Sequence, residues 1–357
     1  MIGNLHNAVR QNGTVSQNGT VRPTRTAAVK TFDEIILPCG VRDSIGDVLQ
    51  SFPNPIDDID RSLASLHVIF SQLPVDQLQQ ILDFGRHVDA AGVMLVRNLP
   101  VDPDLPATPV DGGPSTDKKT FVAECVLLGL SQLLGEPVGF TTEKGGRLVH
   151  DVVPVSAGAE TQTNQSSTVF LNFHNDIVHD EVGRYDISNP DFLVLNCLRQ
   201  DAGKEAVTYY ADARDISSSL DPHTAETLRA PLFRLNAPGS YVRDFANGAD
   251  LLSSPMGVIS GPSHSPEVVI SANGVRGLTG EAEETLKELQ RTCSAVAHRV
   301  RLEPGTALLI NNRKGLHARS QFFATHNGRD RWLQRTYLRR SLWNIRYRVT
   351  PSDRRVH

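Results

Sequence analysis

The sequence is poor in cysteine, and its few cysteines lie far apart along the chain. Only four occur among 357 residues, and none forms a C-x-x-C pair. This spacing argues against a disulfide framework and against a structural zinc site. We expect buried thiols in a reducing compartment at Cys39, Cys125, Cys197 and Cys293.

Long apolar runs and an excess of basic charge are also missing. No stretch approaches the roughly 18 apolar residues of a membrane span, and the N-terminus lacks the pattern of a secretory signal, so the expected location is cytoplasmic. Lys and Arg number 36 against 40 Asp and Glu, which gives a net charge of −4. Because a mildly acidic chain without a basic stripe repels phosphate groups, neither nucleic acid nor a membrane is an expected partner.

Hydrophobic patterning predicts a mostly β fold with flanking helices. The first 30 residues are polar, repeat Gln-Asn-Gly-Thr and predict a disordered arm, so residues 31–357 are expected to form one domain. Many short apolar runs separated by Gly, Pro, Asn and Asp favour a jelly-roll core, the double-stranded β-helix. Helices are expected over 74–91, 118–134 and 281–298, and strands near 93–97, 148–155, 168–173, 192–198, 206–210, 300–302, 307–310 and 332–338.

A long mixed segment, about residues 212–280, interrupts the strands. In barrels and jelly rolls such an insert commonly covers the mouth of the fold. We expect it to be a lid that selects the substrate. The alternative is a surface elaboration without contact to the site.

Three His-x-Asp/Glu sequences occur where composition predicts about one by chance. His87-Val-Asp89 lies on an expected helix, where positions two apart point about 200° away from each other and cannot share a metal. His179-Asp-Glu181 is typical of a polar turn. His174-Asn-Asp176 follows an alternating strand pattern, in which positions two apart face the same side. This last pair is therefore the candidate for metal binding.

A third ligand is available at His317, which follows an apolar run and a polar turn. Two histidines and one carboxylate form a facial triad that leaves three adjacent coordination positions open. This suits Fe(II) with a bidentate cosubstrate and dioxygen, whereas zinc prefers a closed or nearly closed tetrahedron. Each histidine taken singly is also compatible with a core or turn histidine whose hydrogen bonds are satisfied.

Three arginines share one face of the strand expected near 332–338. Alternation places Arg331, Arg335 and Arg339 on the same side as Leu333 and Tyr337. Arginine captures carboxylates through two parallel hydrogen bonds, and a buried guanidinium requires an anionic partner. A dicarboxylate cosubstrate would supply that partner.

Six segments, taken in order and spacing, resemble the clavaminate synthase family of Fe(II)/2-oxoglutarate oxygenases, which includes arginine and asparagine hydroxylases. They are RLVHDVVP (147–154), FHND (173–176), NPDFLVLNCLR (189–199), LEPGTALLINN (302–312), HAR (317–319) and GRDRW (328–332). The resemblance runs from about residue 90 to 340. It implies a jelly-roll enzyme that uses Fe(II), 2-oxoglutarate and O2 to hydroxylate an amino acid or a related metabolite in specialised metabolism, with release of succinate and carbon dioxide.

The resemblance also implies roles for single residues. His174, Asp176 and His317 would hold the iron. Arg331 would bind the distal carboxylate of 2-oxoglutarate with help from the Thr208 hydroxyl.

Three further residues match substrate positions of the family. Arg335 matches the arginine that holds the substrate's carboxylate, while Tyr337 and Asn164 match residues of the substrate pocket. The carboxylate ligand is Asp176 in place of the Glu more common in this subgroup, and its presence argues against a halogenase.

Other functions remain open at this point. A desaturase or cyclase would use the same oxidising chemistry. A zinc hydrolase could use the same three ligands with an activated water but would have no use for Arg331, and a jelly-roll binding protein could carry a vestigial metal site. The sequence leaves open the substrate, the carbon oxidised, whether the substrate is free or carrier-bound, and the oligomeric state.

Overall fold

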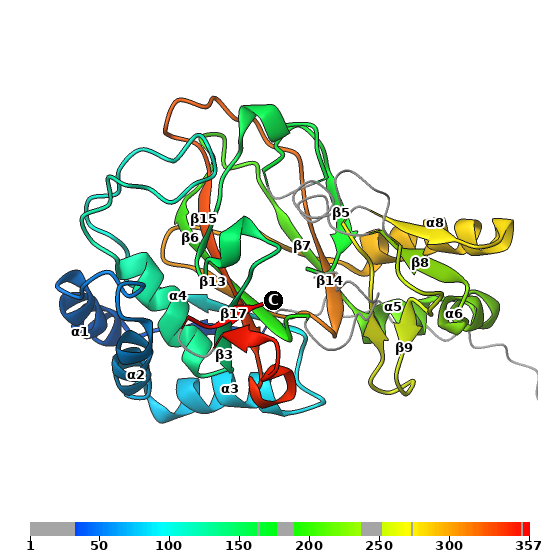
Figure 1. Cartoon of the computed structure of the whole chain (residues 1–357), viewed down its shortest axis with the longest axis horizontal. Helices are drawn as coiled ribbons and strands as arrows, with labels where there is room; N and C mark the ends of the chain where they lie inside the picture. The colour runs from blue at the N-terminus through cyan, green and yellow to red at the C-terminus, as the bar shows by residue number, and fades with distance from the viewer. Residues whose placement is uncertain (1–32, 163–164, 177–188, 237–251, 273, 351–352) are drawn as a thin grey trace, which may run out of the picture. The chain divides into compact units, whose positions relative to one another are not determined.

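The computed structural model describes residues 33–162, 165–176, 189–236, 252–272, 274–350 and 353–357 (Figure 1). The arm expected over residues 1–30 therefore lies outside the described residues. Within the described ranges, no helix is both long enough and apolar enough to cross a membrane.

Two sheets form the centre of the described chain (Figure 1). The large sheet has the order β1 (Asp33–Ile36), β2 (Val93–Arg97), β13 (Ala307–Asn311), β6 (Phe192–Arg199), β15 (Trp332–Arg339), β3 (Glu136–Phe140), β17 (Arg355–Val356) and β16 (Val349–Thr350), and β4 (His150–Val152) also pairs with β15. The small sheet has the order β12 (His298–Val300), β7 (Thr208–Asp212), β14 (Gly315–Arg319) and β5 (Leu171–His174).

Four helices cover one face of the large sheet: α1 (Cys39–Gln50), α2 (Ile59–Phe70), α3 (Val75–Arg86) and α4 (Val122–Gln132). Along β2, Met94 packs with these helices, whereas Val93 and Leu95 pack in a second cluster that includes Tyr210 of β7. Because both faces of the sheet are buried, β2, β13 and most of β6 are apolar at consecutive positions and do not alternate with polar residues. The second cluster fills the space between the two sheets.

The start of α4 is fixed by a residue distant in sequence. The Asp102 carboxylate accepts hydrogen bonds from the backbone N–H groups of Val122 and Ala123, both at 3.1 Å. Lys118, where this helix is expected to begin, instead forms buried ion pairs with Asp102 at 3.0 Å and Glu124 at 2.6 Å. The expected start is wrong because the cap comes from a loop 20 residues upstream.

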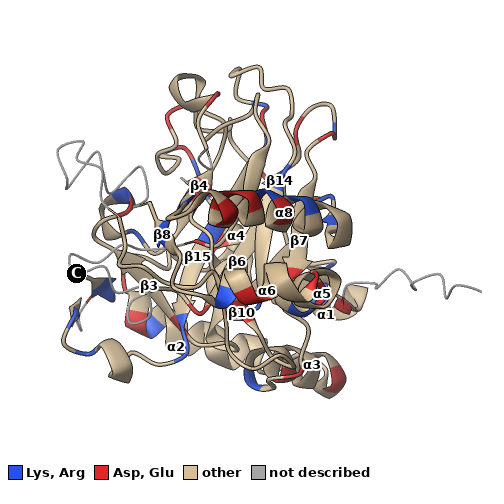
Figure 2. Ribbon diagram, turned by 90° about the vertical axis from the view of Figure 1, so that its right-hand side faces the viewer, with Lys and Arg blue, Asp and Glu red and all other residues tan. Residues whose placement is uncertain are grey.

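The insert adds a layer to the outer face of the small sheet. Its described elements are α5 (Ala213–Ser219), α6 (Pro222–Arg229), β8 (Phe233–Leu235), β9 (Ile259–Ser260), β10 (Glu267–Val268) and β11 (Val275–Gly277), followed by α8 (Gly280–Val296). Ile216, Leu228 and Leu289 from these helices pack in one cluster with Leu316 and Ala318 of β14. On its exposed side α8 carries many acidic residues, coloured red in Figure 2.

Two local expectations are wrong. The helix expected over 74–91 ends at Arg86, and His87 has an extended backbone with its Nε2 atom 3.2 Å from Asp83. The helical geometry used to exclude His87 as a ligand therefore does not apply, although its side chain is exposed and paired elsewhere. Of the four cysteines, Cys39 is exposed and the other three are buried.

Candidate metal centre

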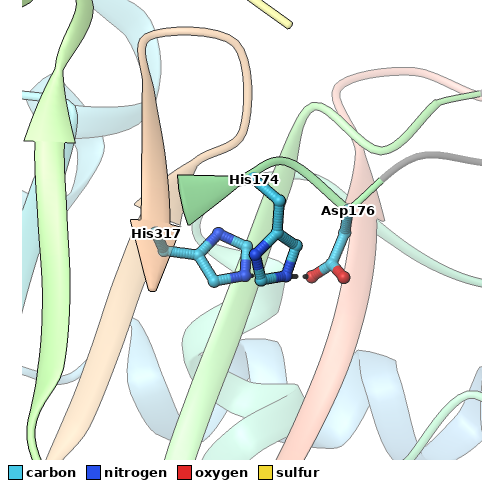
Figure 3. A group of neighbouring side chains, drawn as sticks. All are labelled: His174, Asp176 and His317. Carbon is cyan, nitrogen blue, oxygen red and sulfur yellow. Dashed lines mark ion pairs between the residues drawn. The ribbon is translucent and has the colours of Figure 1, made fainter. Parts of the chain in front are cut away.

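His174, Asp176 and His317 lie together at the inner face of the small sheet (Figure 3). One ligand atom from each side chain lies within 4.8 Å of the other two. His174 ends β5 and pairs directly with His317 of β14, and the two ring centroids lie 4.3 Å apart. Asp176 Oδ2 lies 3.7 Å from His317 Nε2.

Strand register turns His317 toward the space between the sheets. His317 lies opposite Tyr210 of β7, whose side chain belongs to the cluster between the sheets. Directly opposed residues of an antiparallel pair project to the same face. Leu316 and Ala318, on either side of His317, pack outward against the insert. The alternation of side chains along β14 therefore separates His317 from the outer core.

Burial and charge set the protonation state of the three side chains. Burial lowers the pKa of His317 to about 3, with a further contribution from His174. Burial also lowers the pKa of His174. It opposes ionisation of Asp176, but Arg335 and the two histidines outweigh it, so the pKa of Asp176 lies below its usual value. At neutral pH the cluster offers two neutral imidazoles and one carboxylate, as binding of a divalent metal requires.

The hydrogen bonds leave ligand atoms available. His174 Nδ1 lies 2.7 Å from the carbonyl oxygen of Asn172, and donation to that oxygen leaves Nε2 with its lone pair. Asp176 Oδ2 and His317 Nδ1 are buried without a hydrogen-bond partner in the described part of the chain. Such orphaned atoms are rare in folded proteins. Their presence in a set of two histidines and one carboxylate fits an Fe(II) ion.

Arg331 directly precedes β15 of the large sheet, reaches Thr208 of the small sheet, and forms no ion pair within the described part of the chain. It is 6% exposed, and its Nη2 atom lies 3.5 Å from Thr208 Oγ1. Among the described residues, no carboxylate forms an ion pair with it, and burial lowers its pKa. Arg319 is also buried, donates to the Ser166 carbonyl and hydroxyl, and has its pKa lowered to about 9 by burial and by Arg331. Neither guanidinium group has a carboxylate within ion-pairing distance in the described part of the chain, although Asp201 acts on Arg331 from further away.

Arg335 and Tyr337 lie next to the candidate ligands in a second polar cluster. Arg335 Nη1 donates to Asp176 Oδ1 at 2.9 Å, and Nη2 donates to Glu143 Oε1 at 2.6 Å and to His150 Nδ1 at 3.2 Å. The Tyr337 hydroxyl donates to Glu143 Oε2 at 2.9 Å, and its ring lies 4.3 Å from the Arg335 guanidinium carbon. One oxygen of Asp176 is thus bound by Arg335 while the other is left toward the histidines.

The sequence profile of the family described as "Taurine catabolism dioxygenase TauD, TfdA family" matches residues 60–337. The chain belongs to this family. It is 36% identical over 281 residues to L-asparagine oxygenase of Streptomyces coelicolor, covering 78% of this chain and 80% of that protein. It is 28% identical over 302 residues to clavaminate synthase 2 of Streptomyces clavuligerus, covering 84% and 90%.

A solved structure of asparagine oxygenase with Fe(II), 2S,3S-3-hydroxyasparagine and succinate has a similar fold. It matches with a TM-score of 0.79 at 30% sequence identity, over 90% of this chain and 98% of that one. The expected family and enzyme class are confirmed: this TauD/TfdA-family chain is an Fe(II)/2-oxoglutarate-dependent oxygenase. The expected sheet-rich fold with flanking helices is confirmed as well.

Not every expected site residue of this oxygenase reaches the centre. Arg339 donates to the Asn189 carbonyl and pairs with Asp191 at 3.4 Å, so the chain itself supplies its anionic partner. Asn164 and the His179-Asp-Glu181 sequence lie outside the described residues.

Sequence reasoning missed Glu143 and His150. Glu143 is an isolated acidic residue in the turn after β3, and no local pattern marks it; the pairing of β3 with β15 brings it to Arg335. His150 lies in the segment RLVHDVVP, which takes part in the family resemblance, so that segment was the available signal. Burial and Arg335 lower the pKa of His150 well below its usual value.

Proposed function

We propose that this oxygenase hydroxylates a free polar α-amino acid, with L-asparagine as the first candidate. The substrate class is supported by the relative named L-asparagine oxygenase at 36% identity and by the hydroxyasparagine bound in the similar solved structure. We further propose that the core is a double-stranded β-helix, which agrees with two sheets that enclose the ligands.

In this proposal His174, Asp176 and His317 hold Fe(II), and Arg331 with Thr208 binds the distal carboxylate of 2-oxoglutarate. The bound iron and cosubstrate supply the oxidation that converts a C–H bond to C–OH, with release of succinate and carbon dioxide. The observation that carries the proposal is Arg331, a buried guanidinium that lacks a carboxylate partner among the described residues. A dianionic cosubstrate meets that need, whereas a hydrolase would not use it.

Arg335 is proposed to bind the substrate's α-carboxylate. Its Nε atom is buried without a hydrogen-bond partner in the described ranges, which leaves one donor for a ligand. Glu143, held by Arg335 and by the Tyr337 hydroxyl, can accept hydrogen bonds from the α-ammonium group. Two opposite charges at this spacing suit the zwitterion of an amino acid.

The lid expected over about 212–280 remains a proposal. Residues 237–251 lie outside the described ranges, and the described part of the insert packs on the outer face of the small sheet. Contact between Ile270 and Asn175, beside the metal ligands, supports an insert that reaches the site. The single domain over 31–357 and the cytoplasmic location also stay predictions.

Anaerobic titration of apo-protein with Fe(II) and then 2-oxoglutarate tests the cofactor site. We expect the visible charge-transfer band of an iron-bound keto acid in the wild type, and its loss in His317→Ala and in Arg331→Met. A folded, iron-loaded wild type without the band would refute the proposal.

Succinate release with single amino acids then tests the substrate. L-Asparagine is expected to stimulate it, and L-aspartate, L-lysine and D-asparagine are the comparison arms. Mass spectrometry of the product separates hydroxylation, which adds one oxygen atom, from desaturation or ring closure, which removes two hydrogen atoms. A product formed without consumption of 2-oxoglutarate would indicate a hydrolase.

A further inference from the structure

Asn175, the residue between two ligands in the sequence, is 1% exposed, and both ends of its side-chain amide are hydrogen-bonded. Its Nδ2 atom donates to the carbonyls of Asn312 at 2.6 Å and Gly315 at 2.9 Å. Its Oδ1 atom accepts from Ile270 N at 2.8 Å, and its own backbone N–H donates to Ile270 O at 2.9 Å. One buried side chain therefore connects the metal-binding segment, the turn before His317 and the insert.

Asn312 makes the complementary set of contacts and is also 1% exposed. Its Oδ1 atom accepts from the backbone N–H of Asp176 at 3.1 Å, and its Nδ2 atom donates to the carbonyl of Asp176 at 2.8 Å and to that of Pro190 at 3.0 Å. Both backbone polar groups of Asp176 are thus held by a single amide. This fixes the orientation of the peptide groups on either side of the ligand.

Asp176 needs this support because the sheet does not supply it. β5 ends at His174, so the ladder that aligns the two histidines stops before the carboxylate. Asp has a short side chain with only two torsions, so the position of its carboxylate is dictated by the backbone that carries it. Asn312 lies five residues before His317, in the turn between β13 and β14. A hydrogen bond from that turn to Asp176 therefore sets one ligand relative to another.

We propose that Asn175 and Asn312 are positioning residues of the metal centre, which hold Asp176 in register with the two histidines without touching the metal. This rests on the ligand set of the proposed function. Residues that orient metal ligands typically change metal affinity by about 10- to 100-fold when replaced. A merely structural role of the same two amides would change stability and leave the affinity of the folded protein unchanged.

Titration with Co(II), followed by its visible absorption, measures metal affinity without requiring activity. The variants are Asn312→Asp and Asn175→Asp, which keep the shape but replace the donating amide by an acceptor facing two carbonyls. Asn196→Asp is the matched control, because Asn196 is 3% exposed and its Nδ2 atom donates at 3.2 Å to the carbonyl of Ala123, in the first turn of α4. Thermal unfolding of each apo-protein is recorded in parallel.

Asn312→Asp and Asn175→Asp are each expected to bind Co(II) about 10- to 100-fold more weakly than the wild type. The control is expected to lose thermal stability but to bind within threefold. Asn312→Ser replaces Asn312→Asp if the latter does not fold, with the same expectation. A folded variant of Asn175 or Asn312 that binds Co(II) with wild-type affinity would overturn the positioning role. A wild type that binds no Co(II) would instead refute the proposed ligand set, and with it the positioning role of both asparagines.

Discussion

Replacing Arg331 with Met should weaken the binding of 2-oxoglutarate without lowering the stability of the fold. The reason is that Arg331 is buried and forms no ion pair with a carboxylate in the described chain. In the apo-protein the variant removes a desolvated charge and fills a similar volume, so its free energy of unfolding should stay equal or rise by about 1 kcal/mol. Binding of 2-oxoglutarate should suffer, since removal of one partner of a buried carboxylate pair costs about 2–5 kcal/mol. At about 1.4 kcal/mol per factor of ten, this cost predicts that the KM for 2-oxoglutarate rises by a factor between about 30 and several thousand.

Arg339→Met is the matched control on the same strand. Arg339 is 5% exposed against 6% for Arg331, but it is bonded to Asp191 and to the Asn189 carbonyl. Its removal should lower the free energy of unfolding by about 1–3 kcal/mol and leave the KM for 2-oxoglutarate within threefold. Urea denaturation and succinate-release kinetics measure the two quantities. If both variants lose stability equally, or if Arg331→Met keeps the wild-type KM, the reasoning is refuted.

Three further changes test packing, pH dependence and the proposed substrate role of Tyr337. Gly129→Ala should lower stability by about 1–3 kcal/mol, because its Cβ would lie 2.2 Å from the Phe70 ring, whereas Gly280→Ala, with no atom within 4 Å, should be neutral or stabilising in urea denaturation; a stabilised Gly129→Ala would contradict this. His150→Gln should make the loss of stability between pH 7 and 5 less steep than in the wild type. Because the pKa of His150 is lowered by burial, the unfolded chain alone gains this proton below about pH 6.5, so His150 makes stability fall there by up to about 1.4 kcal/mol per pH unit, in addition to the fall caused by His174 and His317. Equal slopes in the two proteins between pH 7 and 5 would contradict that assignment. Tyr337→Phe should raise the KM for the amino acid several-fold but not that for 2-oxoglutarate, and initial rates that show the reverse would exclude its proposed role.

The sequence predicts the elements whose pattern is set by burial along the strand itself. β2, β6 and β13 are apolar at consecutive positions because both faces of the large sheet are covered, and α8 has a clear helical spacing after its Thr279 cap. β3 could not be predicted in this way. Its sequence EPVGF contains Pro and Gly, which weaken a strand, and it is a strand because β15 and β17 pair with it.

Some residues of the candidate site can likewise be predicted from the sequence, and others cannot. His174 and Asp176 are visible in the sequence because two residues of one strand segment share a face, and His317 becomes visible as the third member of a known type of ligand set. Glu143 and Asn312 acquire their contacts only through tertiary structure, since each meets partners more than 130 residues away in the chain. No local period encodes such contacts.

The alternating pattern of the last strand places three arginines on one face but does not show which of them has an anionic partner in the fold. Alternation treats Arg331, Arg335 and Arg339 alike. Yet Arg339 pairs with Asp191, Arg335 pairs with Asp176 and Glu143, and Arg331 forms no ion pair with a carboxylate of the described residues. When a divalent metal takes the charge of Asp176, Arg335 and Glu143 remain as a neutral pair with one group for each end of a zwitterion. An amino acid with an uncharged side chain then adds no net charge to a buried site, whereas lysine or aspartate would add one without a partner in this cluster. The same charge balance on which the proposed role of Arg331 rests therefore favours a substrate such as asparagine.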